Sequence, residues 1–440
     1  MTNPAIQLTV DSGFCTGCAM CEVVCPQKCI CIQETLGGLL EAVIETNQCS
    51  QCGACFKVCG GISLCTEAIP KDMDPFTGTA LKAFLGKAND PLLRKNGQSG
   101  GAAIAIVSHC LQKGKINGVL STFMPKDGSL KPYSKIARNA DELMDSQGSK
   151  YVPVPWARAF EGFDPKTDRI ATVGIPCQYH SLFNAQMTLR KSWGNATALK
   201  IGLACEGILS FAVYDYLLST HSIPRECCRD YRFKSKIPNG WPGDGRAVGF
   251  DETEYFVSNE ARVNCKDAFR PVYCRLCFDK MNILSDIVCA DPWGINHDKE
   301  GYTVVVTRTE RGLAAVQSSI DTGVLIAEEL AWNAVLKCQQ VEERRKNWTT
   351  AMQLTKQQKK ILPNYPIDTK WLAKSVSLRE RHLQQFLLDR SWLLRDIRNS
   401  SEVINTVASF YKKLKMIRKQ ITFWNRWSLL LLFKRIWRKL

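Results

Sequence analysis

The sequence lacks several features that would assign it to other protein classes. It has no run of about 18 apolar residues, so we expect no helix that spans a bilayer. The segment Met1–Phe14 lacks a basic start followed by an apolar run, so we expect no secretory signal peptide. The 21 cysteines then favour reduced thiols in a cytoplasmic compartment over a disulfide framework. No DNA-recognition motif is present, so nucleic acid is not an expected partner.

Histidine is also scarce, and the positive charge is unevenly distributed. A lone histidine is more often structural than catalytic, and His180 stands out only because it follows Cys177 by three positions. Ten Lys and Arg and no acid lie between Lys412 and Leu440, which leaves +6 of the formal +16 on the other residues. With 45% hydrophobic residues, the chain is globular and long enough for two or three domains.

Two cysteine runs with the same spacing lie within residues 14–60. The first run is Cys15, Cys18, Cys21 and Cys25, and the second is Cys49, Cys52, Cys55 and Cys59. Both follow C-x2-C-x2-C-x3-C, with Pro26 after the first run and Gly60 where proline is usual in the second. In two-cluster ferredoxins, the fourth cysteine of each run binds the other cluster.

We therefore interpret residues 1–70 as a ferredoxin-like module with two 4Fe-4S clusters. One cluster would take Cys15, Cys18, Cys21 and Cys59, and the other would take Cys49, Cys52, Cys55 and Cys25. A zinc site or a disulfide scaffold is the alternative, but zinc sites usually bind four ligands in paired spacing.

The rest of the chain predicts a mixed fold, α/β and α+β. Residues 71–95 are polar and interrupted by proline and glycine, and we interpret them as a linker. Residues 96–335 alternate helical and strand patterns, which predicts a mixed α/β domain, and residues 228–262 predict an antiparallel β insertion within it. Residues 336–402 predict a helical C-terminal extension, and residues 403–440 a basic amphipathic tail.

A third group of cysteines follows predicted strands. Cys177 and Cys205 come after the strands Ile170–Val173 and Leu199–Ala204, where ligands bind in α/β sheets. Cys274 and Cys277 form a C-x2-C pair, which alone suits half a zinc site, a redox pair or chance. Together the four thiols could hold a third cubane cluster.

Several segments of the domain resemble one family. They are NGQSGGAAIAIV, GVLSTFMPKDGSLKPYSKIARNADELMDSQGSKYVPVP, ATVGIPCQYHSL, LKIGLACEGILSF, CRLCFDKMNILSDI and GYTVVVTRTERG. They resemble the coenzyme F-420 hydrogenase/dehydrogenase beta-subunit family over roughly residues 90–330. The resemblance implies FAD and a 4Fe-4S cluster held by Cys177, Cys205, Cys274 and Cys277. Two features depart from the family pattern, Glu206 after Cys205 and the motif ADPWG at residues 290–294.

The resemblance implies an iron–sulfur flavoprotein oxidoreductase. It would relay electrons between ferredoxin-type clusters and FAD, and reduce an organic substrate or a deazaflavin-type coenzyme. A ferredoxin or another redox protein would be its partner. The alternative is a non-catalytic electron-transfer subunit of a larger complex. No catalytic residue is identified.

Two segments are candidates for flavin contacts. Ser99, Gly100 and Gly101 precede a predicted helix, whose free N–H groups favour phosphate, although a simple helix-entry turn has the same pattern. The resemblance adds a second turn, formed by Gly148, Ser149, Lys150 and Tyr151. Lys150 would hold a phosphate or the electron-rich edge of the flavin ring, and a solvated surface lysine is the alternative.

The tail combines its basic residues with Trp424, Trp427, Phe433 and Trp437. Such a helix suits an anionic membrane surface, and would place a cytoplasmic protein on the inner face of the membrane. Docking on an acidic partner or on the protein's own body is the alternative.

Overall fold

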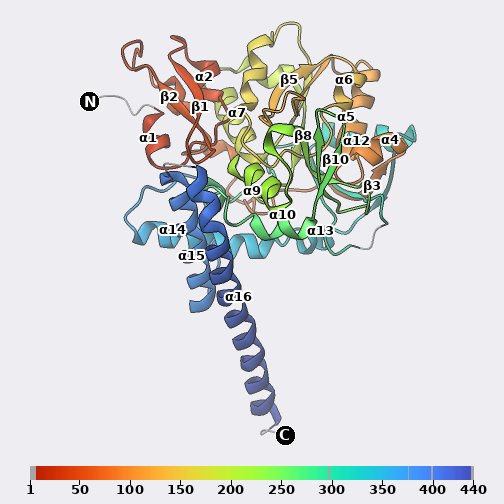
Figure 1. Ribbon diagram of the computed structural model, residues 1–440. Helices are drawn as coiled ribbons and strands as arrows, with labels where there is room; N and C mark the ends of the chain where they lie inside the picture. Colours follow the sequence, from red (N-terminus) through yellow and green to blue (C-terminus); the bar gives the residue numbers. More distant parts are fainter. Residues whose placement is uncertain (1–5, 296–297, 375, 398–399, 438–440) are drawn as a thin grey trace.

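The computed structural model describes residues 6–295, 298–374, 376–397 and 400–437, except the side chains of residues 400, 401, 403 and 424–437. Trp424, Trp427, Phe433 and Trp437 therefore lie outside the described side chains. Figure 1 shows a body of helices and strands from which the last helix, α16, projects.

The N-terminal module contains one unit twice. Its elements are α1 (Gln7–Asp11), α2 (Met20–Val24), β1 (Ile30–Glu34), β2 (Leu40–Ile44), α3 (Ala54–Lys57) and the 3-10 turn η1 (Thr66–Ala68). β1 and β2 form an antiparallel pair. Helices α2 and α3 each begin after a left-handed residue, Ala19 (φ 67°) and Gly53 (φ 72°), that follows the second cysteine of its run. The repeated cysteine spacing therefore corresponds to a repeated backbone turn.

The body is organised around one eight-stranded mixed sheet, ordered β13-β3-β12-β11-β7-β6-β4-β5. Its strands are β3 (Lys82–Ala88), β4 (Gly118–Phe123), β5 (Tyr133–Ala137), β6 (Ile170–Gly174), β7 (Thr197–Leu203), β11 (Ile287–Ala290), β12 (Thr303–Thr307) and β13 (Leu325–Glu329). The pairs β4–β6, β6–β7 and β7–β11 are parallel, and the outer pairs are antiparallel. The α/β prediction for this domain is confirmed at the level of a mixed sheet.

Core clusters cover both faces of the sheet. Successive residues of a strand point to opposite faces, so neighbouring residues pack into different clusters. In β12, Val304 and Val306 pack into one core cluster with Phe278 and Trp348, while Val305 packs into the other cluster beside α5. All five residues of β12 are buried. A strand buried on both faces reads as a continuous apolar run, as TVVVT does.

The helices and turns around the sheet are as follows. They are α4 (Pro91–Asn96), α5 (Ala102–Gln112), α6 (Ala140–Met144), η2 (Trp156–Gly162), α7 (Pro176–Thr188), α8 (Ser192–Ala196), α9 (Ala212–Thr220), η3 (Arg225–Cys227), α10 (Asn259–Cys265), α11 (Val272–Arg275), α12 (Glu310–Asp321), α13 (Trp332–Cys338), α14 (Val341–Gln357), η4 (Thr369–Trp371), α15 (Leu378–Asp396) and α16 (Ser400–Trp437). The predicted β insertion forms a separate antiparallel sheet of β8 (Cys228–Ser235), β9 (Asp244–Gly249) and β10 (Glu254–Val257).

Two predicted boundaries are wrong. The linker assigned to residues 71–95 contains strand β3, which pairs with β12 and β13 inside the main sheet, so the sheet domain begins before residue 96. The tail assigned to residues 403–440 is also partly core, because Val407, Phe410, Leu414 and Ile417 are buried. Within the described part of the chain, no helix is long and apolar enough to cross a membrane.

Candidate cofactor and redox site

The structure groups the ferredoxin cysteines into two sets. Cys15, Cys18, Cys21 and Cys59 lie close enough for their charges to interact. Cys25, Cys49, Cys52 and Cys55 line a small cavity together with Cys29, whose Sγ lies 3.6 Å from that of Cys25. Each set has three cysteines of one run and the fourth of the other, as cluster sharing requires.

The module packs directly on helix α7 of the sheet domain. An ideal Cβ on Gly60 would lie 2.5 Å from the Cβ of His180 and 2.6 Å from the N of Ser181. Gly60 donates its N–H to Ser181 Oγ (3.1 Å), and Ser181 Oγ lies 3.5 Å from Cys18 Sγ. A glycine in place of the usual proline therefore lets α7 approach the cysteine loop closely.

A two-armed ion pair also holds the module in place. Arg158 donates from Nε and Nη2 to the two carboxylate oxygens of Glu22, each at 3.0 Å. Arg158 Nη2 also donates to Ile32 O at 3.3 Å, and Ala157 N donates to Cys18 O at 2.8 Å. These contacts fix the module against the short helical segment η2.

The four remaining candidate cysteines line one cavity beside the module. Cys177 opens α7 after β6, and Cys205 follows the neighbouring parallel strand β7, so both lie at the same edge of the sheet. Cys274 and Cys277 come from α11 and the residues after it, and the cavity wall includes all four cysteines together with Gly60 and Gly61. The sheet edge and α11 thus assemble a four-thiol set from segments far apart in sequence.

The electrostatics of this cavity suit a bound metal cluster. Burial, above all, raises the pKa of the four thiols, to about 12 for Cys205 and about 11 for Cys274 and Cys277. The same cause holds the pKa of Cys177 well above its usual range. Thiolates would therefore need a cationic partner such as iron, since a coordinated thiol is deprotonated. Arg344 of α14 contributes positive charge, because Cys277, Glu206 and Cys205 keep its pKa above the ordinary value although burial opposes this.

In the described residues, no three His, Cys, Asp or Glu side chains converge closely enough to hold a single metal ion. A cubane cluster takes its four thiolates at separate iron atoms. The four thiols line one cavity, and four thiolates are the donor set of such a cluster.

A large cavity, of about 590 Å³, adjoins this thiol set. Its wall includes six of the predicted flavin contacts, which are Ser99, Gly101, Gly148, Ser149, Lys150 and Tyr151. The wall also contains Ala102, Ala103 and Ile104, the first turn of the eleven-residue helix α5. The free N–H groups of such a turn favour a phosphate. Both predicted segments, about 50 residues apart, thus reach one cavity that fits a flavin diphosphate.

Gly100 lies behind the cavity wall instead of in it. Its N–H donates to Thr303 Oγ1 (2.9 Å), so that N–H is not available to a phosphate. An ideal Cβ at this position would lie 2.6 Å from Gly86 O, which explains the need for glycine. Its neighbour Gly101 adopts φ +78° directly before α5, a backbone conformation that glycine adopts readily.

Lys150 lies half-buried at the cavity wall, and is not the solvated lysine of the alternative interpretation. Its Nζ donates to Ser146 O (2.6 Å) and Gln147 O (3.2 Å). Burial, with the nearby positive charge of Arg232, lowers the pKa of Lys150 to about 7. The carboxylate of Asp145 opposes this shift, and a diphosphate bound beside the amine would likewise favour its charged form.

The structure adds polar residues that the sequence did not indicate. Gln98 Nε2 donates to Tyr151 Oη (2.6 Å), and Gln98 Oε1 accepts from Ser149 N (3.2 Å), so Gln98 joins the two predicted turns. Lys234 of β8 forms a buried ion pair with Asp291 (2.6 Å) in the same wall. Asp291 belongs to the ADPWG motif, whose departure from the family pattern was the only signal for this pair.

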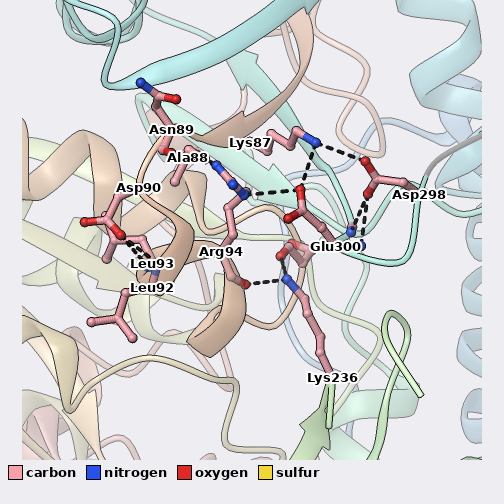
Figure 2. Close-up of polar contacts among 12 residues, drawn as sticks. Lys87, Ala88, Asn89, Asp90, Leu92, Leu93, Arg94, Lys236, Asp298 and Glu300 are labelled. Carbon is pink, nitrogen blue, oxygen red and sulfur yellow. Dashed lines mark hydrogen bonds and ion pairs between the residues drawn. The ribbon is translucent and has the colours of Figure 1, made fainter. Parts of the chain in front are cut away.

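A network of ion pairs and hydrogen bonds surrounds the turn at Ser99 in the cavity wall (Figure 2). Lys87 Nζ lies 3.0 Å from Asp298 Oδ2 and 3.1 Å from Glu300 Oε2, and Arg94 Nε lies 3.3 Å from the same Glu300 oxygen. Lys236, at the end of β8, donates to the carbonyl oxygens of Arg94 and Ser99. The network links the insertion, α4 and strand β3 around the predicted diphosphate turn.

The thiol cavity and the large cavity share wall residues. Cys177 and Cys205 line both, as do Thr16, Ile175, Gly207 and Ile208. Glu206, also in the wall of the large cavity, forms an ion pair with Lys280. A flavin in the large cavity would therefore lie next to a cluster in the thiol cavity, and the ferredoxin thiol Cys18 lies near enough to Cys177 for their charges to interact.

Two family models match this chain. The model of the N-terminal part of the coenzyme F420 hydrogenase/dehydrogenase beta subunit matches residues 83–161, and the model of its C terminus matches residues 167–332. The chain therefore belongs to the coenzyme F420 hydrogenase/dehydrogenase beta-subunit family, a family of oxidoreductase subunits of coenzyme F420 redox chemistry. The resemblance seen in the sequence is confirmed.

Two relatives of this chain are proteins of Methanocaldococcus jannaschii. An uncharacterized protein of Methanocaldococcus jannaschii is 26% identical over 364 residues, covering 76% of this chain and 95% of that protein. The coenzyme F420-dependent sulfite reductase of the same organism is 24% identical over 350 residues, covering 76% of this chain and 50% of the reductase. This chain thus spans only half the length of that reductase.

A solved structure shares the fold. It is a chain from the F420-reducing nickel–iron hydrogenase complex of Methanosarcina barkeri, with a TM-score of 0.51 and 17% sequence identity. The match covers 66% of this chain and 98% of that chain.

Proposed function

We propose that this protein is an iron–sulfur flavoprotein oxidoreductase with two ferredoxin-type 4Fe-4S clusters, a third 4Fe-4S cluster and one FAD. Cys177, Cys205, Cys274 and Cys277 would hold the third cluster. FAD, when bound, would exchange electron pairs with an organic substrate or a deazaflavin-type coenzyme, and single electrons with the clusters.

The observation that carries this proposal is the pair of cavities joined at Cys177 and Cys205. The chain's own residues would order the cofactors in one line. The module thiols come first, then Ser181 and Cys177 on α7, and then the large cavity. Cys52 is the exposed member of the set Cys25, Cys49, Cys52 and Cys55. It would lie nearest to a ferredoxin or another protein partner.

The wall of the large cavity would orient the flavin. The first turn of α5 and Lys150 would hold the diphosphate, and Gln98 would fix the two turns relative to each other. The Lys234–Asp291 and Lys280–Glu206 pairs would present charged groups to the remaining space, where a substrate would bind.

The test is anaerobic reduction of the purified, reconstituted protein. We expect reduced coenzyme F420 to bleach the flavin absorbance and then the iron–sulfur absorbance, and reduced ferredoxin to bleach them in the opposite order. Absence of flavin after reconstitution with FAD, or no bleaching by either donor, would contradict the proposal.

A second candidate function is a non-catalytic electron-transfer subunit, favoured by the relation to hydrogenase subunits. An enzyme would turn over an organic acceptor alone with reduced ferredoxin. A subunit would exchange electrons with both carriers and turn over no acceptor until its partner protein is added.

A further inference from the structure

Helix α16 has two halves with different surroundings. Its first half packs on the body through Val407, Phe410, Leu414 and Ile417, which are all buried. Arg418 Nη2 also forms an ion pair with Asp267 Oδ2 at 2.8 Å. The second half projects from the body as continuous helix to Trp437 (Figure 1).

The packed face of the helix is distinct from the opposite one. The buried residues recur at three- and four-residue intervals, as expected for one helix face. Met416 and Phe423, seven residues apart, are 56% and 53% exposed. Large apolar side chains therefore face outward already where the helix leaves the body.

The residues that follow the packed half of α16 are mostly basic or apolar. It contains Arg426, Lys434, Arg435, Arg438 and Lys439, and no acid. Between these basic residues lie Trp427 and the five apolar residues 429–433. This apolar run of five residues is longer than one helical turn of 3.6 residues.

This pattern distinguishes a lipid surface from a protein groove. A protein groove binds one apolar stripe of a helix, whereas a membrane surface accepts an uninterrupted apolar run between basic residues. Pairing of two copies of this helix would bring like charges together and is disfavoured. The apolar segment is too short to cross a bilayer, and flanking Lys, Arg and Trp residues suit the headgroup region.

We propose that residues 424–440 dock the protein on an anionic membrane surface, while residues 400–423 connect this anchor rigidly to the body. The inference does not depend on the redox function. The anchor would hold the redox domain in a fixed orientation to the membrane surface, because the packed half of α16 is part of the core of that domain.

The test uses full-length holoprotein and a chain that ends at residue 423. This end point keeps Leu414 and Ile417, which a truncation at residue 410 would remove from the core. We expect the full chain to sediment with vesicles of phosphatidylglycerol and phosphatidylcholine, and much less with phosphatidylcholine alone. High salt should weaken this binding. The truncated chain should keep its iron and flavin and lose the sedimentation.

A matched pair of variants separates the tail from net charge. In the tail, Lys434, Arg435, Arg438 and Lys439 become Gln, and in the control the exposed Lys113, Lys115, Lys166 and Lys191 become Gln. We expect the tail variant to lose about fivefold in vesicle affinity per charge removed, and the control variant to bind as the parent does.

Three results would overturn the proposal. They are equal binding by the truncated chain, equal weakening by both sets of substitutions, and tail-dependent self-association or capture of an acidic protein without any vesicle binding.

Discussion

Ser181 Oγ lies 3.5 Å from the Sγ of Cys18, and it also accepts the N–H of Gly60 at 3.1 Å. Ser181 is fully buried and lies one helical turn after Cys177 on α7. One helix face therefore carries a candidate ligand of the third cluster and a hydroxyl that touches a ligand of the ferredoxin module. Because the Gly60 N–H binds the hydroxyl oxygen, the hydroxyl hydrogen is free to point at a Cys18 thiolate.

Replacing Ser181→Ala should lower the reduction potential of one ferredoxin cluster. Hydrogen bonds to the sulfur atoms stabilise the reduced, more negative cluster and raise its potential. A redox titration followed by electron paramagnetic resonance should show one of the three clusters shifted to lower potential, with unchanged iron content. Ser319→Ala is the control, since Ser319 is equally buried but donates within its own helix, to Ala315 O. Unchanged potentials in Ser181→Ala would remove this role.

Replacing Gly60→Ala should destabilise the contact between module and α7. The new Cβ would lie 2.5 Å from His180 Cβ and beside backbone atoms, and overpacking of this kind costs about 1–3 kcal/mol in the free energy of unfolding. Chemical denaturation should report the loss. Gly162→Ala is the matched control, because no atom lies within 4 Å of the position of its Cβ. Equal stability of the two variants would contradict the prediction.

The sequence predicted those parts of the site that depend on local spacing. Three cysteines on one tight loop must converge, so the two ferredoxin sets could be anticipated from the sequence alone. The positions of Cys177 and Cys205 followed from strands that end at a common sheet edge. The turn before α5, which stays a predicted flavin contact, followed from glycines next to a helix.

Other features depend on contacts between distant segments. The apolar run of strand β3 is short, because Lys82 precedes it and Gly86 and Lys87 follow it. Its partners β12 and β13 lie more than 200 residues away. Arg344 comes from a charged helix with no local sign that it reaches the thiol cavity. Gly60 is informative only when the position of α7 is known.

Replacing Cys274→Ala should remove the third cluster alone. The parent should contain about twelve irons, counting four per cubane, and the variant about eight. The ferredoxin signals should remain, since the eight module cysteines are untouched. Iron analysis with resonance spectroscopy of the reduced protein measures both. Cys110→Ala, which changes a buried cysteine of α5 outside the three thiol sets, should keep all twelve irons, and an equal loss in that variant would mean that the iron count reflects general instability.

Because the pKa of Lys150 is about 7, we expect the binding of FAD to depend on pH. A diphosphate beside the amine favours its charged form, so binding should take up a proton above pH 7. The affinity for FAD should therefore fall as the pH rises from about 7, by up to about tenfold per pH unit. Titration of flavin-free protein with FAD, followed by fluorescence quenching, measures this slope.

Two substitutions at Lys150 separate its charge from its shape. Lys150→Arg stays charged and should remove the pH dependence while keeping binding at high pH. Lys150→Met should bind weakly at every pH. The flavin-free parent should also become more stable as the pH rises above about 7, because the unfolded chain keeps this amine protonated to about pH 10 while the folded protein does not. Parallel pH profiles for the parent and Lys150→Arg would show that another group controls flavin binding. Lys150 would then only hold the turn after α6, through Ser146 O and Gln147 O.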